Sequence, residues 1–111
     1  MPLSEKLVSL RDFIIPRGGD SRERRTFDIK RGHVTWFRVQ LEVKSGEEWK
    51  SVRRWDSSHG FVDCDSYNLA GQKRKEIYLH VSLEEGLTKA QEDMNDHWRS
   101  YRERFLHGGF P

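Results

Sequence analysis

Hydrophobic and polar residues alternate with a period of two between residues 34 and 43. Because successive side chains of a β-strand point to opposite faces of a sheet, this alternation predicts a strand with one apolar and one polar face. The expected apolar face carries Phe37, Val39, Leu41 and Val43, and the expected polar face carries Trp36, Arg38, Gln40 and Glu42.

Shorter strand-like segments surround this one and are separated by turn residues such as Gly46. The predicted strands cover residues 26–29, 34–43, 49–55, 61–67 and 76–81. Strands joined by connections this short are typical of an antiparallel meander. We therefore expect a four- to five-stranded antiparallel meander sheet, most of it within residues 34–81.

From residue 82 the pattern changes to the period of an α-helix. Apolar residues recur at every third or fourth position, at Leu83, Leu87, Ala90, Met94, Trp98, Tyr101 and Phe105. Ser82 and Glu85 form a capping box at the start of this segment, whereas Gly86 weakens it by about 1 kcal/mol relative to alanine. A helix over residues 82–106 that covers one face of the sheet gives an α+β fold.

The predicted helix is about 37 Å long at 1.5 Å per residue, which exceeds the width of the sheet. Its far end, with Trp98, Tyr101 and Phe105, is therefore expected to overhang. An apolar overhang needs a partner, and a second copy of the chain is the candidate, which would make a homodimer through the helix.

The N-terminal part of the chain is less regular. Residues 4–14 have apolar positions three and four apart, which predicts a short helix ended by Pro16, although residues 13–15 could equally start a strand. Residues 17–25 are expected to form a mobile basic loop. The wider segment 17–33 carries a net charge of +3 and is interpreted as a solvated loop or as a basic arm that meets phosphate.

Composition narrows the class of protein. The 111 residues suit a single domain, and their aromatic content of 12% argues against a disordered chain. A net charge of +2 gives little support to a dedicated duplex-binding protein. The single cysteine, Cys64, excludes an internal disulfide and a multi-thiolate zinc site and is expected to be buried. No signal peptide, membrane span or cofactor motif is recognised, so we expect a soluble, cytoplasmic protein without a cofactor.

The segment 52–61, with the sequence Val-Arg-Arg-Trp-Asp-Ser-Ser-His-Gly-Phe, is the strongest candidate for a functional site. In a catalytic interpretation His59 carries a proton, because the unperturbed pKa of a histidine side chain, ~6.5, suits proton exchange at neutral pH. Asp56 then orients the ring, and Arg53 or Arg54 stabilises an anion. In the structural alternative, Asp56 caps the turn by accepting a backbone N–H and His59 has no chemical role.

A metal site is a further alternative, since Asp56, His59, Asp63 and Asp65 are suitable ligand types. Their spacing matches no diagnostic motif, so no metal is predicted.

The two faces of the sheet have different expected roles. Val52, Val62, Cys64, Ile77, Leu79 and Val81 are expected to join the apolar face under the helix. The open face is expected to display Arg38, Gln40, Arg53, Trp55, Phe61, Asp63, Asp65, Tyr78 and His80. Such a face can bind a ligand or single-stranded nucleic acid by stacking and charge, or it can be a solvated surface with cross-strand ion pairs.

The segment Arg54-Trp-Asp-Ser-Ser-His-Gly60 resembles a signature, Arg-Tyr/Trp-Asp-x-x-His-Gly, of an uncharacterised family of small bacterial and archaeal proteins. Those proteins end in a helix similar to residues 90–105, so the resemblance covers roughly residues 34–106. The Arg-Trp-Asp part is more distantly similar to TumE-type toxins of toxin–antitoxin pairs, which usually have a histidine-rich stretch where this chain has residues 63–67. The resemblance implies a small cytoplasmic α+β domain that acts on RNA or translation, with an antitoxin as partner.

Two functions follow from these observations. The first is a non-enzymatic binding or assembly module, in which Arg54, Trp55, Asp56 and His59 lock the turn. The alternative is a toxin-like, nucleic-acid-directed protein, such as a ribonuclease, with His59, Asp56 and Arg54 as its catalytic residues. Whether the protein is an enzyme is left open at this point.

Overall fold

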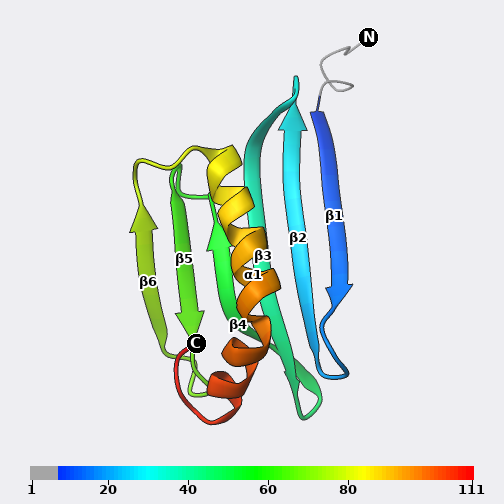
Figure 1. Cartoon of the computed structure of the whole chain (residues 1–111), viewed down its shortest axis with the longest axis vertical. Helices are drawn as coiled ribbons and strands as arrows, with labels where there is room; N and C mark the ends of the chain where they lie inside the picture. Colours follow the sequence, from blue (N-terminus) through cyan, green and yellow to red (C-terminus); the bar gives the residue numbers. More distant parts are fainter. Residues whose placement is uncertain (1–7) are drawn as a thin grey trace.

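The structure, a computed structural model, describes residues 8–111 and contains six strands followed by one helix. Each strand pairs antiparallel with the next, so the open sheet has the order β1-β2-β3-β4-β5-β6 (Figure 1). The fold is α+β, as predicted, but the sheet has six strands instead of four or five. The elements are β1 (Val8–Pro16), β2 (Ser21–Lys30), β3 (His33–Ser45), β4 (Glu48–Asp56), β5 (Val62–Tyr67), β6 (Lys73–Tyr78) and α1 (Leu83–Leu106).

The two N-terminal strands replace the helix and the loop that the sequence pattern predicted. The expected helix at 4–14 is wrong where β1 covers it, and its first residues, up to 7, lie outside the described part of the chain. The expected loop at 17–25 is wrong from Ser21 onward, where β2 begins. The physical reason is strand pairing. β1 pairs with β2 along its whole length, and this satisfies the hydrogen bonding of backbone N–H and C=O groups. An isolated helix of this length is only marginally stable.

Helix α1 lies along one face of the sheet, chiefly over β3 and β4 (Figure 1). The predicted cap is confirmed, because the Ser82 side chain accepts a hydrogen bond of 3.1 Å from the backbone N–H of Glu85. The expected overhang is wrong for Tyr101 and Phe105, which are buried, since the helix runs along the strands and not beyond them. The core consists of Phe37, Val39, Leu41, Val43, Val52, Trp55, Val62, Cys64, Leu87, Ala90, Met94, Tyr101 and Phe105.

A β-bulge between β3 and β4 decides which side chains of β4 face the helix. The register shifts between Leu41 and Glu42, so that Val52 is an extra residue and Arg53 lies opposite Leu41. Arg53 and Trp55 therefore share the helix side with Val52, and their predicted place on the open face is wrong. A shift of one residue moves every following side chain of a strand to the other face, and a bulge produces such a shift.

Strand β6 also faces the opposite way from the prediction. Tyr78 pairs with Val62 on the helix side and stacks on Trp55 at 5.2 Å, whereas Ile77 lies opposite Asp63 on the open face and is exposed. The strand ends at Tyr78, earlier than predicted, because its register with β5 ends there. Outside β5 and β6, Leu79 and His80 are exposed, Phe61 is partly exposed, and Val81 packs at the margin of the core.

Across the described residues, no helix has the length and apolar character that crossing a membrane requires.

Candidate functional site

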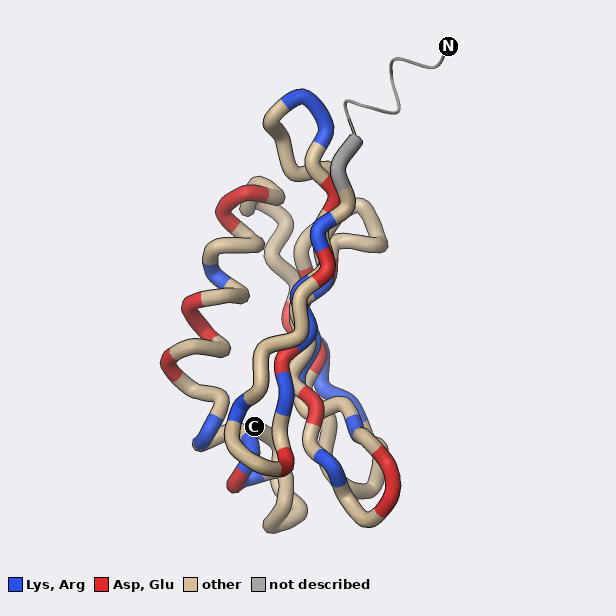
Figure 2. Tube along the Cα trace, turned by 90° about the vertical axis from the view of Figure 1, so that its right-hand side faces the viewer, with Lys and Arg blue, Asp and Glu red and all other residues tan. Residues whose placement is uncertain are grey.

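The face of the sheet opposite α1 is polar and has no element of the described chain packed over it (Figure 2). Strand pairing brings together on this face side chains from five neighbouring strands. They are Arg22, Arg24, Thr26 and Asp28 of β2, Trp36, Arg38, Gln40 and Glu42 of β3, Arg54 and Asp56 of β4, Asp63 and Asp65 of β5, and Lys75 of β6.

The turn after β4 is held by its own side chains. The Asp56 carboxylate accepts hydrogen bonds from the backbone N–H of Ser58 and from Arg38 Nε, the latter at 2.8 Å. Burial acts to raise the pKa of Asp56, but these hydrogen bonds from Ser58 and Arg38 outweigh it and lower the pKa. Ser57 joins the turn to β3, because its Oγ accepts a hydrogen bond of 2.9 Å from Phe37 N. The capping role considered for Asp56 is confirmed.

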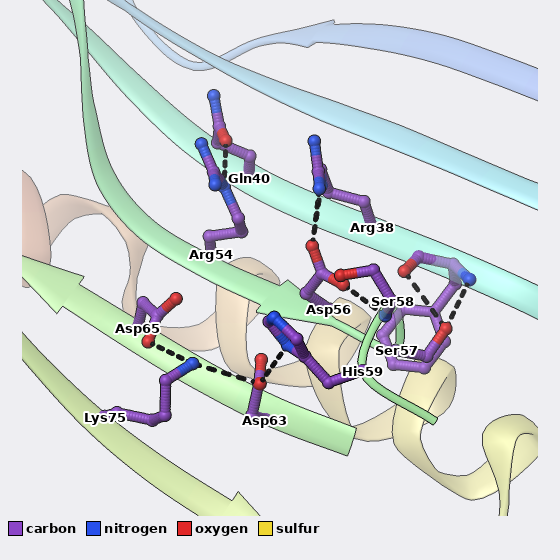
Figure 3. A network of polar contacts seen from close by, with 11 residues as sticks. Arg38, Gln40, Arg54, Asp56, Ser57, Ser58, His59, Asp63, Asp65 and Lys75 are labelled. Carbon is purple, nitrogen blue, oxygen red and sulfur yellow. Dashed lines mark hydrogen bonds and ion pairs between the residues drawn. The ribbon is translucent and has the colours of Figure 1, made fainter. Parts of the chain in front are cut away.

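His59 contacts Asp63, not Asp56 (Figure 3). His59 Nδ1 lies 3.1 Å from Asp63 Oδ2, and the imidazole side chain is 62% exposed while the Asp63 side chain is 1% exposed. The expectation that Asp56 orients the His59 ring is therefore wrong. The reason is register: Asp56 is already paired with Arg38 across the β3–β4 ladder, and the turn returns His59 over β5.

Two buried carboxylates of β5 share one lysine. Lys75 Nζ lies 3.0 Å from Asp63 Oδ2 and 3.0 Å from Asp65 Oδ1. Desolvation opposes the effect, but the pairs with Asp65 and Asp63 raise the pKa of Lys75. Asp63 Oδ1 is buried and accepts no hydrogen bond from the described residues. In the same part of the chain, no group of three or more His, Cys, Asp or Glu side chains is arranged to hold a metal ion.

A concavity of about 200 Å³ opens on this face between β2, β3 and β4. It is lined by Arg24, Thr26, Trp36, Arg38, Gln40 and Arg54. The Arg54 guanidinium is oriented by Gln40, whose Oε1 accepts a hydrogen bond of 2.6 Å from Arg54 Nε. The Arg38 guanidinium lies 5.9 Å from the centroid of the Trp36 ring. We name this group of lining residues the arginine concavity.

The sequence prediction included Arg38, Gln40 and Arg54 but missed Arg24 and Trp36 as members of one site. Arg24 was assigned to a loop, because the dense charges of residues 17–25 concealed the alternation of the strand. That alternation was nevertheless present: Arg22 and Arg24 point to the open face, while Glu23 and Arg25 point to the helix side. Trp36 was recognised on the polar face, but nothing in the sequence placed it in one concavity with arginines from two other strands.

Arg53 and Trp55 belong instead to a buried network that joins α1 to the sheet. Asp93 of α1 accepts hydrogen bonds from Arg53 Nε at 2.7 Å, from Trp55 Nε1 at 2.9 Å and from the Tyr101 hydroxyl. Arg53 Nη1 also donates to Ser66 at 2.8 Å. These contacts give Arg53 and Trp55 a structural role, so the predicted binding surface loses both of them.

The family model of a domain of unknown function, DUF7718, matches residues 5–110 of the chain. Comparison with curated proteins and comparison with solved structures both find no match.

Proposed function

The chain belongs to the DUF7718 family, and we propose that it is a non-enzymatic binding module that binds single-stranded RNA on its open sheet face. The observation that carries this proposal is the arginine concavity, which is lined by Trp36 and by three arginines from three neighbouring strands. RNA is found in the cytoplasm, and this is where we expect the protein to act.

The charge distribution within the open face supports an anionic ligand. Four acidic groups there have a cationic partner: Glu42 pairs with Arg22, Asp56 with Arg38, and Asp63 and Asp65 with Lys75. By contrast, neither Arg24 nor Arg54 has a carboxylate within ion-pair distance among residues 8–111. These two guanidinium groups both line the arginine concavity, where they can attract phosphate.

The shape and lining of the concavity favour a polymer over an enclosed small molecule. A volume of about 200 Å³ is below the range of about 300–1,000 Å³ that is typical of drug-sized ligand pockets. A phosphate group fits such a space while the adjoining base remains outside it. Trp36 is partly exposed at the same place and offers a ring on which a base can stack. Stacking combined with backbone charge contacts is how proteins bind single strands without an enclosing pocket.

The proposal is tested by titrating a fluorescently labelled single-stranded RNA with the protein at several salt concentrations. Arg54→Gln and Arg24→Gln should each weaken binding and reduce the slope of log affinity against log salt by about 0.7 for each lost phosphate contact. Trp36→Ala should weaken binding about 5- to 150-fold, because stacking of one base is worth about 1–3 kcal/mol.

Lys89→Gln is the matched control, since it removes the same charge from an exposed position on α1, on the far side of the sheet. It should leave both affinity and salt slope unchanged. Equal losses for Lys89→Gln and Arg54→Gln would show that binding reflects diffuse charge, and no salt-dependent binding by the native chain would refute the proposal.

The His59–Asp63 pair favours a second candidate, a toxin-like ribonuclease. A buried carboxylate at Nδ1 orients the ring while most of the imidazole side chain stays exposed, which is the arrangement that a proton-transferring histidine needs. Arg38 and Arg54 lie on the same face (Figure 3) and can hold the RNA phosphate at which cleavage takes place. This candidate implies an antitoxin partner.

The two candidates differ in what His59→Ala does. For a ribonuclease, the substitution should abolish cleavage of the RNA and relieve growth inhibition in a bacterial host, while RNA affinity remains. For a binding module, the native chain leaves the RNA intact and growth unaffected, and that result would eliminate the ribonuclease.

A further inference from the structure

The two edges of the sheet are protected to different degrees. β6 presents four charged residues in succession, 73–76, and such charges discourage pairing with another chain. β1 presents exposed apolar side chains instead: Leu10 is 63% exposed, Phe13 49% and Ile14 58%. Although β1 also carries Arg11 and Asp12, an edge strand with exposed apolar side chains is typical of a surface that pairs with another strand.

The apolar side chains of β1 lie on both faces of the sheet. Leu10 and Ile14 point to the open face, because they lie opposite Asp28 and Arg24. Phe13 points to the helix side, where its ring centroid is 6.2 Å from that of Phe27. Helix α1 does not shield this region, since it packs over β3, β4 and β5 while β1 stands at the far edge (Figure 1).

We propose that β1 pairs antiparallel with β1 of a second copy of the chain, so that two sheets become continuous in a homodimer. The interface would be isologous, with a two-fold axis perpendicular to the sheet. In such a pairing one residue of β1 lies opposite its own copy across the axis, and residues equally distant from this central residue on the two copies lie opposite each other. Each choice of central residue therefore predicts a defined set of cross-strand pairs.

The charges of β1 select the register. A centre at Arg11 or Asp12 places two like charges directly opposite each other, which is destabilising. A centre at Phe13 places the two rings opposite each other and sets Asp12 against Ile14 of the other copy and Arg11 against its Ile15. This register pairs residues 10–16, whereas a centre at Ile14 pairs fewer residues of the strand. The Phe13-centred register is therefore the one we infer.

This dimer differs from one formed through α1, because Tyr101 and Phe105 of the helix are buried within their own chain. It also keeps the two open faces on the same side. The two β3 strands would then be separated by five strand spacings, about 24 Å. The inference does not depend on what the open face binds.

The mass of the full chain in solution, measured by light scattering over a range of concentrations, tests the dimer. The native chain should have twice the mass of one copy, and Phe13→Lys combined with Ile14→Lys should be monomeric with an unchanged circular dichroism spectrum. Ile77→Lys is the matched control, because it changes a similarly exposed apolar residue on β6, and it should remain dimeric. A monomeric native chain, a dimer that survives the double substitution or a dimer lost in Ile77→Lys would overturn the proposal.

Single cysteine substitutions then test the register independently. Opposed Cα atoms of an antiparallel pair are about 4.5–5.5 Å apart, within the range that a disulfide spans, so Phe13→Cys should cross-link two copies on mild oxidation. In this register residue 12 of one copy lies opposite residue 14 of the other. Asp12→Cys alone or Ile14→Cys alone therefore does not bring two cysteines together, and neither should cross-link. The native Cys64 is buried and does not compete. Cross-linking through Asp12→Cys but not through Phe13→Cys would refute the register.

Discussion

Gly86→Ala is a substitution for which helix propensity and packing predict opposite signs. Gly86 lies in the first turn of α1, and alanine there should stabilise an isolated helix by about 1 kcal/mol. In the folded protein a Cβ at this position would lie 2.7 Å from Val62 Cγ2 and 3.2 Å from two carbons of the Phe37 ring. Both neighbours are fully buried.

Overpacking of this kind costs about 1–3 kcal/mol. After the gain of about 1 kcal/mol from helix propensity is subtracted, we expect Gly86→Ala to lower the free energy of unfolding by about 1 kcal/mol. Urea denaturation followed by tryptophan fluorescence measures this change. A comparable increase in stability would refute the reasoning, since it would mean that the helix approaches the sheet less closely than the structure shows.

Two further variants separate the two effects. Lys89→Gly, at an exposed position of the same helix, measures the propensity term alone and should cost about 1 kcal/mol. Val62→Ala removes the methyl group that the new Cβ would meet, so Gly86→Ala should become stabilising in that background. The resulting coupling energy between the two positions should lie within about 0.5–3 kcal/mol. Additive effects of the two substitutions would contradict the proposed steric contact.

Two electrostatic predictions follow from ion pairs that α1 makes, one with β4 and one with the turn between β1 and β2. Asp93→Asn leaves the buried Arg53 without its counter-charge and should lower the free energy of unfolding by about 3 kcal/mol, whereas Asp96→Asn, exposed on the same helix, should have little effect. The hydrogen bond from Arg102 lowers the pKa of Asp20 from 3.8 to about 2. Because the pKa is lower in the folded state, the stabilisation is present above pH 3.8 and lost as pH falls through about 2. The urea midpoint of Asp20→Asn should therefore change less with pH across this interval than that of the native chain. High salt should reduce this difference between the two proteins, because the Arg102–Asp20 pair is partly exposed.

Periodicity in the sequence was sufficient to predict helix α1 and strand β3. The capping box at Ser82 and the apolar positions down to Phe105 predicted the start and the length of α1. The alternation of residues 34–43 predicted the apolar and polar faces of β3, and all four residues of its expected apolar face are buried. These patterns are local, since each depends on residues only a few positions apart.

Pairing across the sheet decided what the sequence left open. The bulge beside Leu41 turned Arg53 and Trp55 toward α1, and the partnership with β2 made β1 a strand. A bulge and a strand partner depend on hydrogen bonds between segments distant in the chain, and these leave no trace in the spacing of one segment.

The candidate site also depends on pairing between strands. The sequence predicted the turn and its His59, but the partner of the histidine is Asp63 on the following strand. The arginine concavity joins Arg24 and Arg54, which are thirty residues apart in the chain and become neighbours only through the register of β2, β3 and β4. A periodic pattern can show which face a side chain takes, but the side chains that stand beside it across the ladder are determined by tertiary structure.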